Sequence, residues 1–117
     1  MFKTALIVLF ASSIPALADP PSIDGVTARK DGNTWRFDVT LSHGDTGWDH
    51  YADGWRVVDA NGNELGMRVL AHPHVNEQPF TRSLSGVAIP EGLSEVGIQA
   101  RDNLTGWGPT VRKVQLR

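Results

Sequence analysis

The stretch Thr34-Trp35-Arg36-Phe37-Asp38-Val39-Thr40-Leu41-Ser42 decides the fold of this chain. Apolar side chains occupy every second position, and polar side chains occupy the positions between them. Because successive side chains of a β-strand point to opposite faces, this alternation predicts a strand with one buried and one solvent-facing side. The preceding Lys30-Asp31-Gly32-Asn33 is typical of a hairpin turn, so the alternating residues 26–29 are predicted to form its partner strand.

The rest of the chain contains several similar short alternating stretches, separated by turn signals such as Asn61-Gly62 and Pro90-Glu91-Gly92. Further strands are predicted at 54–59, 64–69, 82–89, 95–101 and 110–116. A change of parity in the third of these predicts a bulge near Ser85-Gly86. No stretch shows helical periodicity over three turns. The pattern predicts a single all-β sandwich of about seven strands, with Trp35 and Trp55 in its core.

One segment resembles a known family. Val96 to Asp102, followed by Gly106-Trp107-Gly108-Pro109, resembles the closing hairpin of fibronectin type III and related immunoglobulin-like domains. The resemblance covers roughly the last twenty residues, and no tyrosine stands near the start of the penultimate strand, where those domains commonly place one. It implies an immunoglobulin-like antiparallel β-sandwich, in which short turns lie at one end and the long loops 43–53, 71–81 and 102–109 lie at the other. Trp55 would then match the buried tryptophan of those domains.

These long loops carry all four histidines of the chain. Loops on a rigid sandwich are common places for function, so we expect a site at this end. Imidazole suits Cu(II) and Zn(II), and the proline between His72 and His74 favours an extended backbone from which both rings could project together. Carboxylates nearby could bind the metal or orient a ligating imidazole. The candidate metal ligands are His43, Asp45, Asp49, His50, His72 and His74.

The same histidines could instead hold their loops in place through hydrogen bonds to neighbouring carboxylates and carbonyls. A different interpretation uses the aromatic side chains of the loops, since aromatic rings beside polar groups are typical of recognition surfaces for proteins or glycans. The candidate ligand-binding residues are Trp48, Tyr51, Asp53, Gln78, Arg82 and Trp107. Trp48 and Trp107, flanked by glycines, could also fold back over the core. A histidine metal site should lose its ligand below about pH 6, whereas an aromatic surface should not.

The segment Glu77-Gln78-Pro79-Phe80-Thr81-Arg82 joins charged, amide, aromatic and basic residues without a break. One interpretation is that Phe80 closes the open end of the sandwich while Arg82 pairs with Asp49 or Asp53. The other is that Arg82 is buried beneath the histidine loops and orients them.

The first eighteen residues predict a cleaved signal peptide. Lys3 gives a positive start, residues 5–11 form a short apolar run, and Ala16-Leu17-Ala18 is a small-x-small cleavage signal. The apolar run is well below the ~20 residues that span a bilayer, so we expect no membrane anchor. The expected organisation is a signal peptide at 1–18, a proline-containing leader at 19–22 and a sandwich domain at 23–117, in the periplasm or outside the cell.

The amino-acid composition excludes several classes of function. The formal net charge of −2 argues against nucleic acid as a partner. The chain has no cysteine, which excludes thiolate nucleophiles and cysteine-based metal sites and leaves stability to an apolar core. Ser83-Leu84-Ser85-Gly86 is not a nucleophile elbow, no paired carboxylates stand out, and a small hydrolase is the least favoured reading. We therefore expect a monomeric, non-catalytic binding domain whose partner is copper, zinc, or an exported protein or glycan.

Overall fold

The computed structural model describes residues 19–117, and the predicted signal peptide at 1–18 lies outside them. The strands are β1 (Ser22–Asp31), β2 (Thr34–Ser42), β3 (Ala52–Val58), β4 (Glu64–Val69), β5 (Phe80–Val87), β6 (Glu95–Asp102), β7 (Gly106–Trp107) and β8 (Arg112–Gln115). Residues 19–117 contain no helix, and therefore none of a length and hydropathy suited to crossing a membrane.

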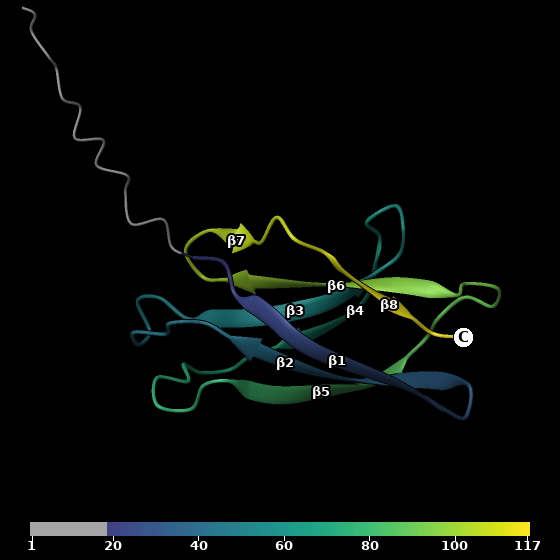
Figure 1. Ribbon diagram of the computed structural model, residues 1–117, viewed down its shortest axis with the longest axis horizontal. Coiled ribbons are helices and arrows are strands. Elements are labelled where there is room, and N and C mark those ends of the chain that lie inside the picture. Colours follow the sequence, from purple (N-terminus) through teal and green to yellow (C-terminus); the bar gives the residue numbers. More distant parts are fainter. Residues whose placement is uncertain (1–18) are drawn as a thin grey trace, which may run out of the picture.

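The strands form two antiparallel sheets that pack face to face (Figure 1). The first sheet has the order β1-β2-β5. The second has the order β4-β3-β6, and both β7 and β8 pair with β6. The predicted all-β sandwich is therefore confirmed, with eight strands because the two-residue β7 lies inside the predicted loop 102–109.

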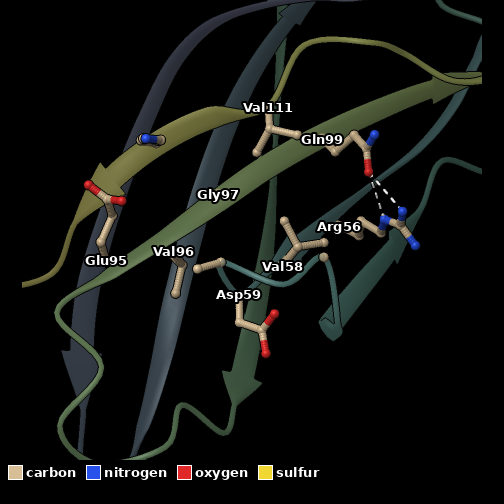
Figure 2. Close-up of a pocket in the computed structure, with 11 residues that line it drawn as sticks. Arg56, Val58, Asp59, Glu95, Val96, Gly97, Gln99 and Val111 are labelled. Atoms are coloured by element: carbon tan, nitrogen blue, oxygen red, sulfur yellow. Dashed lines mark hydrogen bonds between the residues drawn. The ribbon is translucent and has the colours of Figure 1, made fainter.

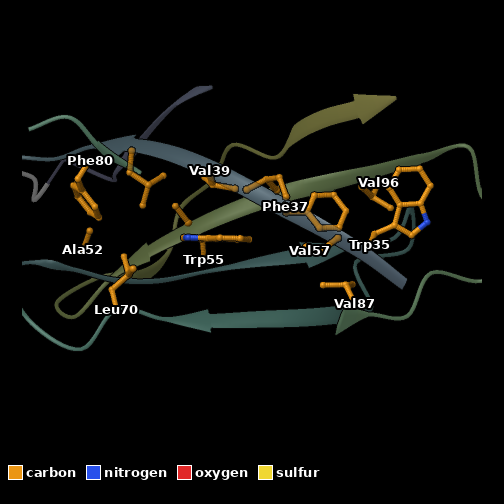
Figure 3. Packing of buried hydrophobic residues seen from close by; sticks show 13 residues of the cluster. Trp35, Phe37, Val39, Ala52, Trp55, Val57, Leu70, Phe80, Val87 and Val96 are labelled. Atoms are coloured by element: carbon orange, nitrogen blue, oxygen red, sulfur yellow. The ribbon is translucent and has the colours of Figure 1, made fainter. Parts of the chain in front are cut away.

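The core lies between the two sheets, as the alternation predicted (Figure 3). Phe37, Val39 and Leu41 of β2 are fully buried, and Trp55 of β3 faces them from the second sheet, also fully buried. Trp35 closes the core near the start of β2, at the end of the sandwich opposite the long loops. Each of these side chains contributes about 1.5–3 kcal/mol through removal of apolar surface from water.

The predicted bulge is present in β5. The pairing of β2 with β5 shifts register between Trp35–Val87 and Phe37–Leu84, so that Ser85 and Gly86 together lie opposite the single residue Arg36. Gly86 has a φ of 72°, a conformation that glycine adopts without steric cost.

The connections separate into two groups at opposite ends of the sandwich (Figure 1). The loops 43–51, 70–79 and 103–105 follow β2, β4 and β6 and lie together at one end. The turns at 32–33, 59–63 and 88–94 lie at the other end. The expected gathering of the long loops is thus present, and it determines where the histidines meet.

The fold predicts a sharp contrast between the two faces of the first sheet. Phe37→Ala removes a fully buried ring and should lower the free energy of unfolding by about 3–5 kcal/mol. Arg29→Ala, on the exposed side of β1, should change it by less than about 0.5 kcal/mol. Urea unfolding followed by tryptophan fluorescence measures both, and equal effects would contradict the strand assignment.

Candidate metal centre

The loop end of the sandwich is organised around the carboxylate of Asp45, whose side chain is fully buried. His43 donates to it from Nδ1 at 2.6 Å, and the backbone N–H groups of Ala52 and His74 donate at 2.9 and 2.8 Å. His43 follows β2 and Ala52 begins β3, whereas His74 belongs to the loop between β4 and β5. One carboxylate therefore joins the two histidine loops.

Gln78 provides a second connection between the same loops. Its Oε1 accepts a hydrogen bond from the backbone N–H of His43 at 2.9 Å, and its Nε2 donates to the carbonyl of His74 at 2.9 Å. With Asp45, this amide holds the 70–79 loop against the end of β2. Gln78 is exposed, and its amide joins the two histidine loops.

Three potential ligands converge beside this connection. His43, His50 and Asp102 each offer one ligand atom, and the three atoms lie within 4.8 Å of one another. His50 Nε2 is 3.6 Å from Asp102 Oδ1, and the rings of His43 and His50 meet edge to face with 4.6 Å between centroids. The side chains of His43 and Asp102 are about 1% and 0% exposed, and that of His50 is 18% exposed.

The Nε2 atoms of His43 and His50 are both available to a ligand. Because Nδ1 of His43 donates to Asp45, Nε2 is the nitrogen that carries the lone pair in the neutral form of this ring. Within residues 19–117, Nε2 of His43 and Nε2 of His50 are both buried and lack a hydrogen-bond partner. Buried polar atoms are normally paired, so two such nitrogens next to a carboxylate mark this place as unusual.

The third group, Asp102, is held as a carboxylate. Its Oδ1 accepts from the backbone N–H groups of Leu104 and Thr105, both at 2.8 Å, and its Oδ2 accepts from Thr105 Oγ1 at 2.6 Å. Burial acts to raise the pKa of Asp102, but these hydrogen bonds together with the nearby His50 lower the pKa below its usual value. Asp102 is therefore ionised at neutral pH.

This arrangement has the chemistry of a transition-metal centre. Two ligand atoms bound at about 2.1 Å in a tetrahedral geometry lie about 3.4 Å apart, close to the 3.6 Å between His50 and Asp102. Binding of a metal would shorten the longer distances within the group, which reach up to 4.8 Å between ligand atoms. The contact from Asp45 to the far nitrogen of His43 matches the common arrangement in which a carboxylate orients a ligating imidazole.

The second histidine loop is not brought into this group. His72 is exposed, and its Nδ1 lies 3.0 Å from the carbonyl of Pro73. His74 is buried, stacks on Phe80 with 3.9 Å between ring centroids, and has its Nε2 at 2.9 Å from Arg82 Nη2. Burial, followed by the charges of Arg82 and His72, lowers the pKa of His74, which favours the neutral ring that accepts from Arg82.

The expected pairing of Arg82 with Asp49 or Asp53 is wrong. Arg82 contacts His74 and pairs with Glu77 at 3.3 Å. Asp53 pairs instead with Arg101, its neighbour across the β3–β6 pair, at 2.9 Å. Asp49 is exposed at the tip of the first loop and lies outside the metal-ligand group.

The three candidate aromatic side chains do not form one surface. Trp48 is 66% exposed and meets Tyr51 edge to face at 5.5 Å. Trp107 is half-buried on the outer side of the second sheet, where the guanidinium groups of Arg56 and Arg101 lie 4.0 and 5.3 Å from its ring centroid. Trp107 is thus already packed against arginine, and neither Trp48 nor Trp107 belongs to the buried core.

Asp102 is the functional candidate that sequence reasoning missed. It ends β6, and the following Asn103 donates from Nδ2 to the carbonyls of Trp48 and Asp49 at 3.1 and 3.3 Å, while its Oδ1 accepts from the N–H of Tyr51 at 2.8 Å. The signal was Asp102-Asn103-Leu104-Thr105-Gly106, a composition typical of a tight turn capped by its first side chain. The loop lies at the predicted end of the sandwich, but Trp107 was its only residue predicted to bind a ligand.

A separate cavity of about 420 Å³ lies on the second sheet (Figure 2). Val58, Gly97 and Val111 contribute its apolar lining. Its polar groups are largely engaged within the fold: Arg56 donates two hydrogen bonds to Gln99, at 3.0 and 2.8 Å. The carboxylate of Asp59, likewise, accepts from residues of the 59–63 turn. This cavity therefore lacks the unpaired buried groups that distinguish the histidine cluster.

Comparison with known proteins adds one relative. A protein of Halomicrobium mukohataei named "Putative lipoprotein" is 43% identical over 77 residues, which cover 66% of this chain and 37% of that protein. The chain thus matches little more than a third of the length of its relative. No family model matches the chain, and no solved structure matches it.

The Asp45 connection predicts a large effect of one carboxylate on stability. Asp45→Ala leaves three buried donors unpaired at about 1–3 kcal/mol each, so the free energy of unfolding should fall by at least about 3 kcal/mol. Asp49→Ala removes an exposed carboxylate of the same loop and should cost less than about 0.5 kcal/mol. Urea unfolding in the presence of a chelator measures both, and similar losses would show that Asp45 does not hold the loops.

Proposed function

We propose that this chain is an exported, non-catalytic binding domain whose site is a divalent transition-metal centre formed by His43, His50 and Asp102. The observation that carries the proposal is the pair of buried Nε2 atoms that have no hydrogen-bond partner among residues 19–117 and lie next to the carboxylate of Asp102. A buried polar atom without a partner costs about 1–3 kcal/mol. A bound cation would convert two such costs into ligand bonds.

The donor set favours Zn(II) or Cu(II). Two imidazole nitrogens and one carboxylate oxygen suit these borderline ions, and a chain without cysteine offers no thiolate to select Cu(I). Metal ligands must be deprotonated, which agrees with the lowered pKa of Asp102 and with a His43 whose Nδ1, rather than Nε2, donates to Asp45.

The interpretation of the histidines as loop-holding groups suits His72 and His74 better than His43 and His50. His74 contacts Arg82, and His72 lies against the carbonyl of Pro73. His43 and His74 each have one paired ring nitrogen and one buried ring nitrogen without a partner among residues 19–117, but only the unpaired nitrogen of His43 belongs to a group of three potential metal ligands. The proposed centre therefore uses the first histidine loop and the β6–β7 turn.

Export is supported by two independent features. Residues 1–18 have the charge, apolar run and small-residue motif of a signal peptide. The relative named "Putative lipoprotein" bears a name given to proteins of the cell envelope. Because the match covers only part of that relative, the domain proposed here would correspond to one portion of it.

A second candidate function is recognition of an exported protein or glycan by the first loop. The observation in its favour is Trp48, a large apolar side chain that is 66% exposed and supported by Tyr51. Trp107 would not take part, since Arg56 and Arg101 lie against its ring. A Trp48→Ser substitution would impair this function and leave metal affinity unchanged.

The test of the metal centre is a calorimetric titration of the purified chain with Zn(II) and with Cu(II). We expect one equivalent to bind with a micromolar or lower Kd. His50→Ala and Asp102→Asn should each weaken binding at least about tenfold, whereas His72→Ala, which removes an exposed histidine outside the cluster, should leave it unchanged.

Circular dichroism of each variant shows whether its fold is retained. Absence of binding to the folded chain would overturn the proposal. Binding that is lost in His72→Ala but kept in His50→Ala would move the site to the second loop.

A further inference from the structure

We propose that the metal in this centre keeps an open coordination position that is taken by a carboxylate attached to an apolar group. The inference rests on the proposed function, because it requires a metal held by His43, His50 and Asp102. It goes further in naming the class of ligand and the side chains that select it.

The first step is the count of ligands. Zn(II) and Cu(II) bind at least four ligand atoms, whereas the cluster supplies one from each of three residues. Both oxygens of Asp45 already accept hydrogen bonds, and His74, whose Nε2 faces Arg82, does not belong to the ligand group. In the described part of the chain, the group therefore leaves a coordination position to an outside ligand.

The second step concerns the path by which an outside ligand reaches the metal and the charge of that ligand. The side chains of His43 and Asp102 are buried, whereas His50 remains partly exposed, so an outside ligand reaches the metal past His50. Among the ligands themselves only Asp102 is charged, so the ion and its ligands keep a net positive charge that favours an anionic donor at the free position. The other buried carboxylate, Asp45, lies on the opposite, Nδ1 side of His43.

The third step concerns the walls of this approach. Trp48 lies two residues before His50, and Leu104 lies two residues after Asp102; they are 66% and 62% exposed. Asn103 bonds to the carbonyl of Trp48, so the turns that carry both side chains are fastened together. Two large exposed apolar side chains carried by adjoining turns are of the kind that mark a contact surface. They would cover the apolar part of a ligand whose carboxylate binds the metal.

The experiment titrates the Cu(II)-loaded full chain with acetate, phenylacetate and phenylacetamide and follows the visible absorption of the metal. Both acids should shift the spectrum, and phenylacetate should bind about tenfold more tightly because its ring is removed from water. Phenylacetamide, which lacks the carboxylate, should leave the spectrum unchanged. The metal-free chain should bind none of the three.

The matched variants separate the apolar walls from the metal. Trp48→Ser combined with Leu104→Ser should reduce the affinity for phenylacetate to that for acetate while the affinity for Cu(II) stays the same. Val111→Ser, which replaces an exposed apolar residue of the separate cavity, should keep the preference. Equal binding of the two acids by the unaltered chain would overturn the role of Trp48 and Leu104.

Failure of this inference is distinguishable from failure of the metal centre. If Cu(II) binds tightly but neither acid changes its spectrum, the coordination is complete and the open position does not exist. If Cu(II) does not bind, the centre itself is wrong.

A further arm identifies the source of the carboxylate. Tighter binding of acetyl-alanyl-phenylalanine than of phenylacetate points to the C-terminus of a polypeptide, and the reverse order points to a small free acid.

Discussion

The buried carboxylate of Asp45 is the constraint on which the loop end depends. An ionised group removed from water is costly unless it is fully hydrogen-bonded, and Asp45 is satisfied only when His43, Ala52 and His74 all donate to it. The three donors come from the loop after β2, from the first residue of β3 and from the loop between β4 and β5. The loops consequently hold one arrangement, and the imidazole of His43 is fixed in both tautomer and direction.

The two sheets position the candidate metal ligands that lie near this carboxylate. His43 follows the last residue of β2 in the first sheet, and Asp102 is the last residue of β6 in the second. Strands are more rigid than loops, so side chains at the ends of strands are held in place by the sheets. Only His50 is carried by loop backbone, and it is held by a bridge to Gly47 and, through the neighbouring Tyr51, by Asn103.

The sequence allowed much of the fold to be predicted and only part of the candidate site. The alternation around Phe37 identified the core strand, and the parity change near Ser85 identified the bulge, because both patterns are local. The approach of Asp102 to His43 could not be predicted from a local sequence pattern, since it depends on how the two sheets pack. The rings of His72 and His74 do project together, with 4.6 Å between their centroids, but neither belongs to the group of His43, His50 and Asp102. Phe80 and Arg82 engage His74, and these contacts arise only in the folded chain.

The placement of the three candidate ligands has a thermodynamic consequence. His43 and Asp102 belong to opposite layers of the sandwich, so an ion bound between them would act as a cross-link that exists only in the folded state. A ligand of that kind stabilises a protein in proportion to the logarithm of its free concentration relative to Kd. The melting temperature of the domain would then rise and fall with the concentration of free metal in its compartment. The fraction of folded protein would therefore depend on that concentration.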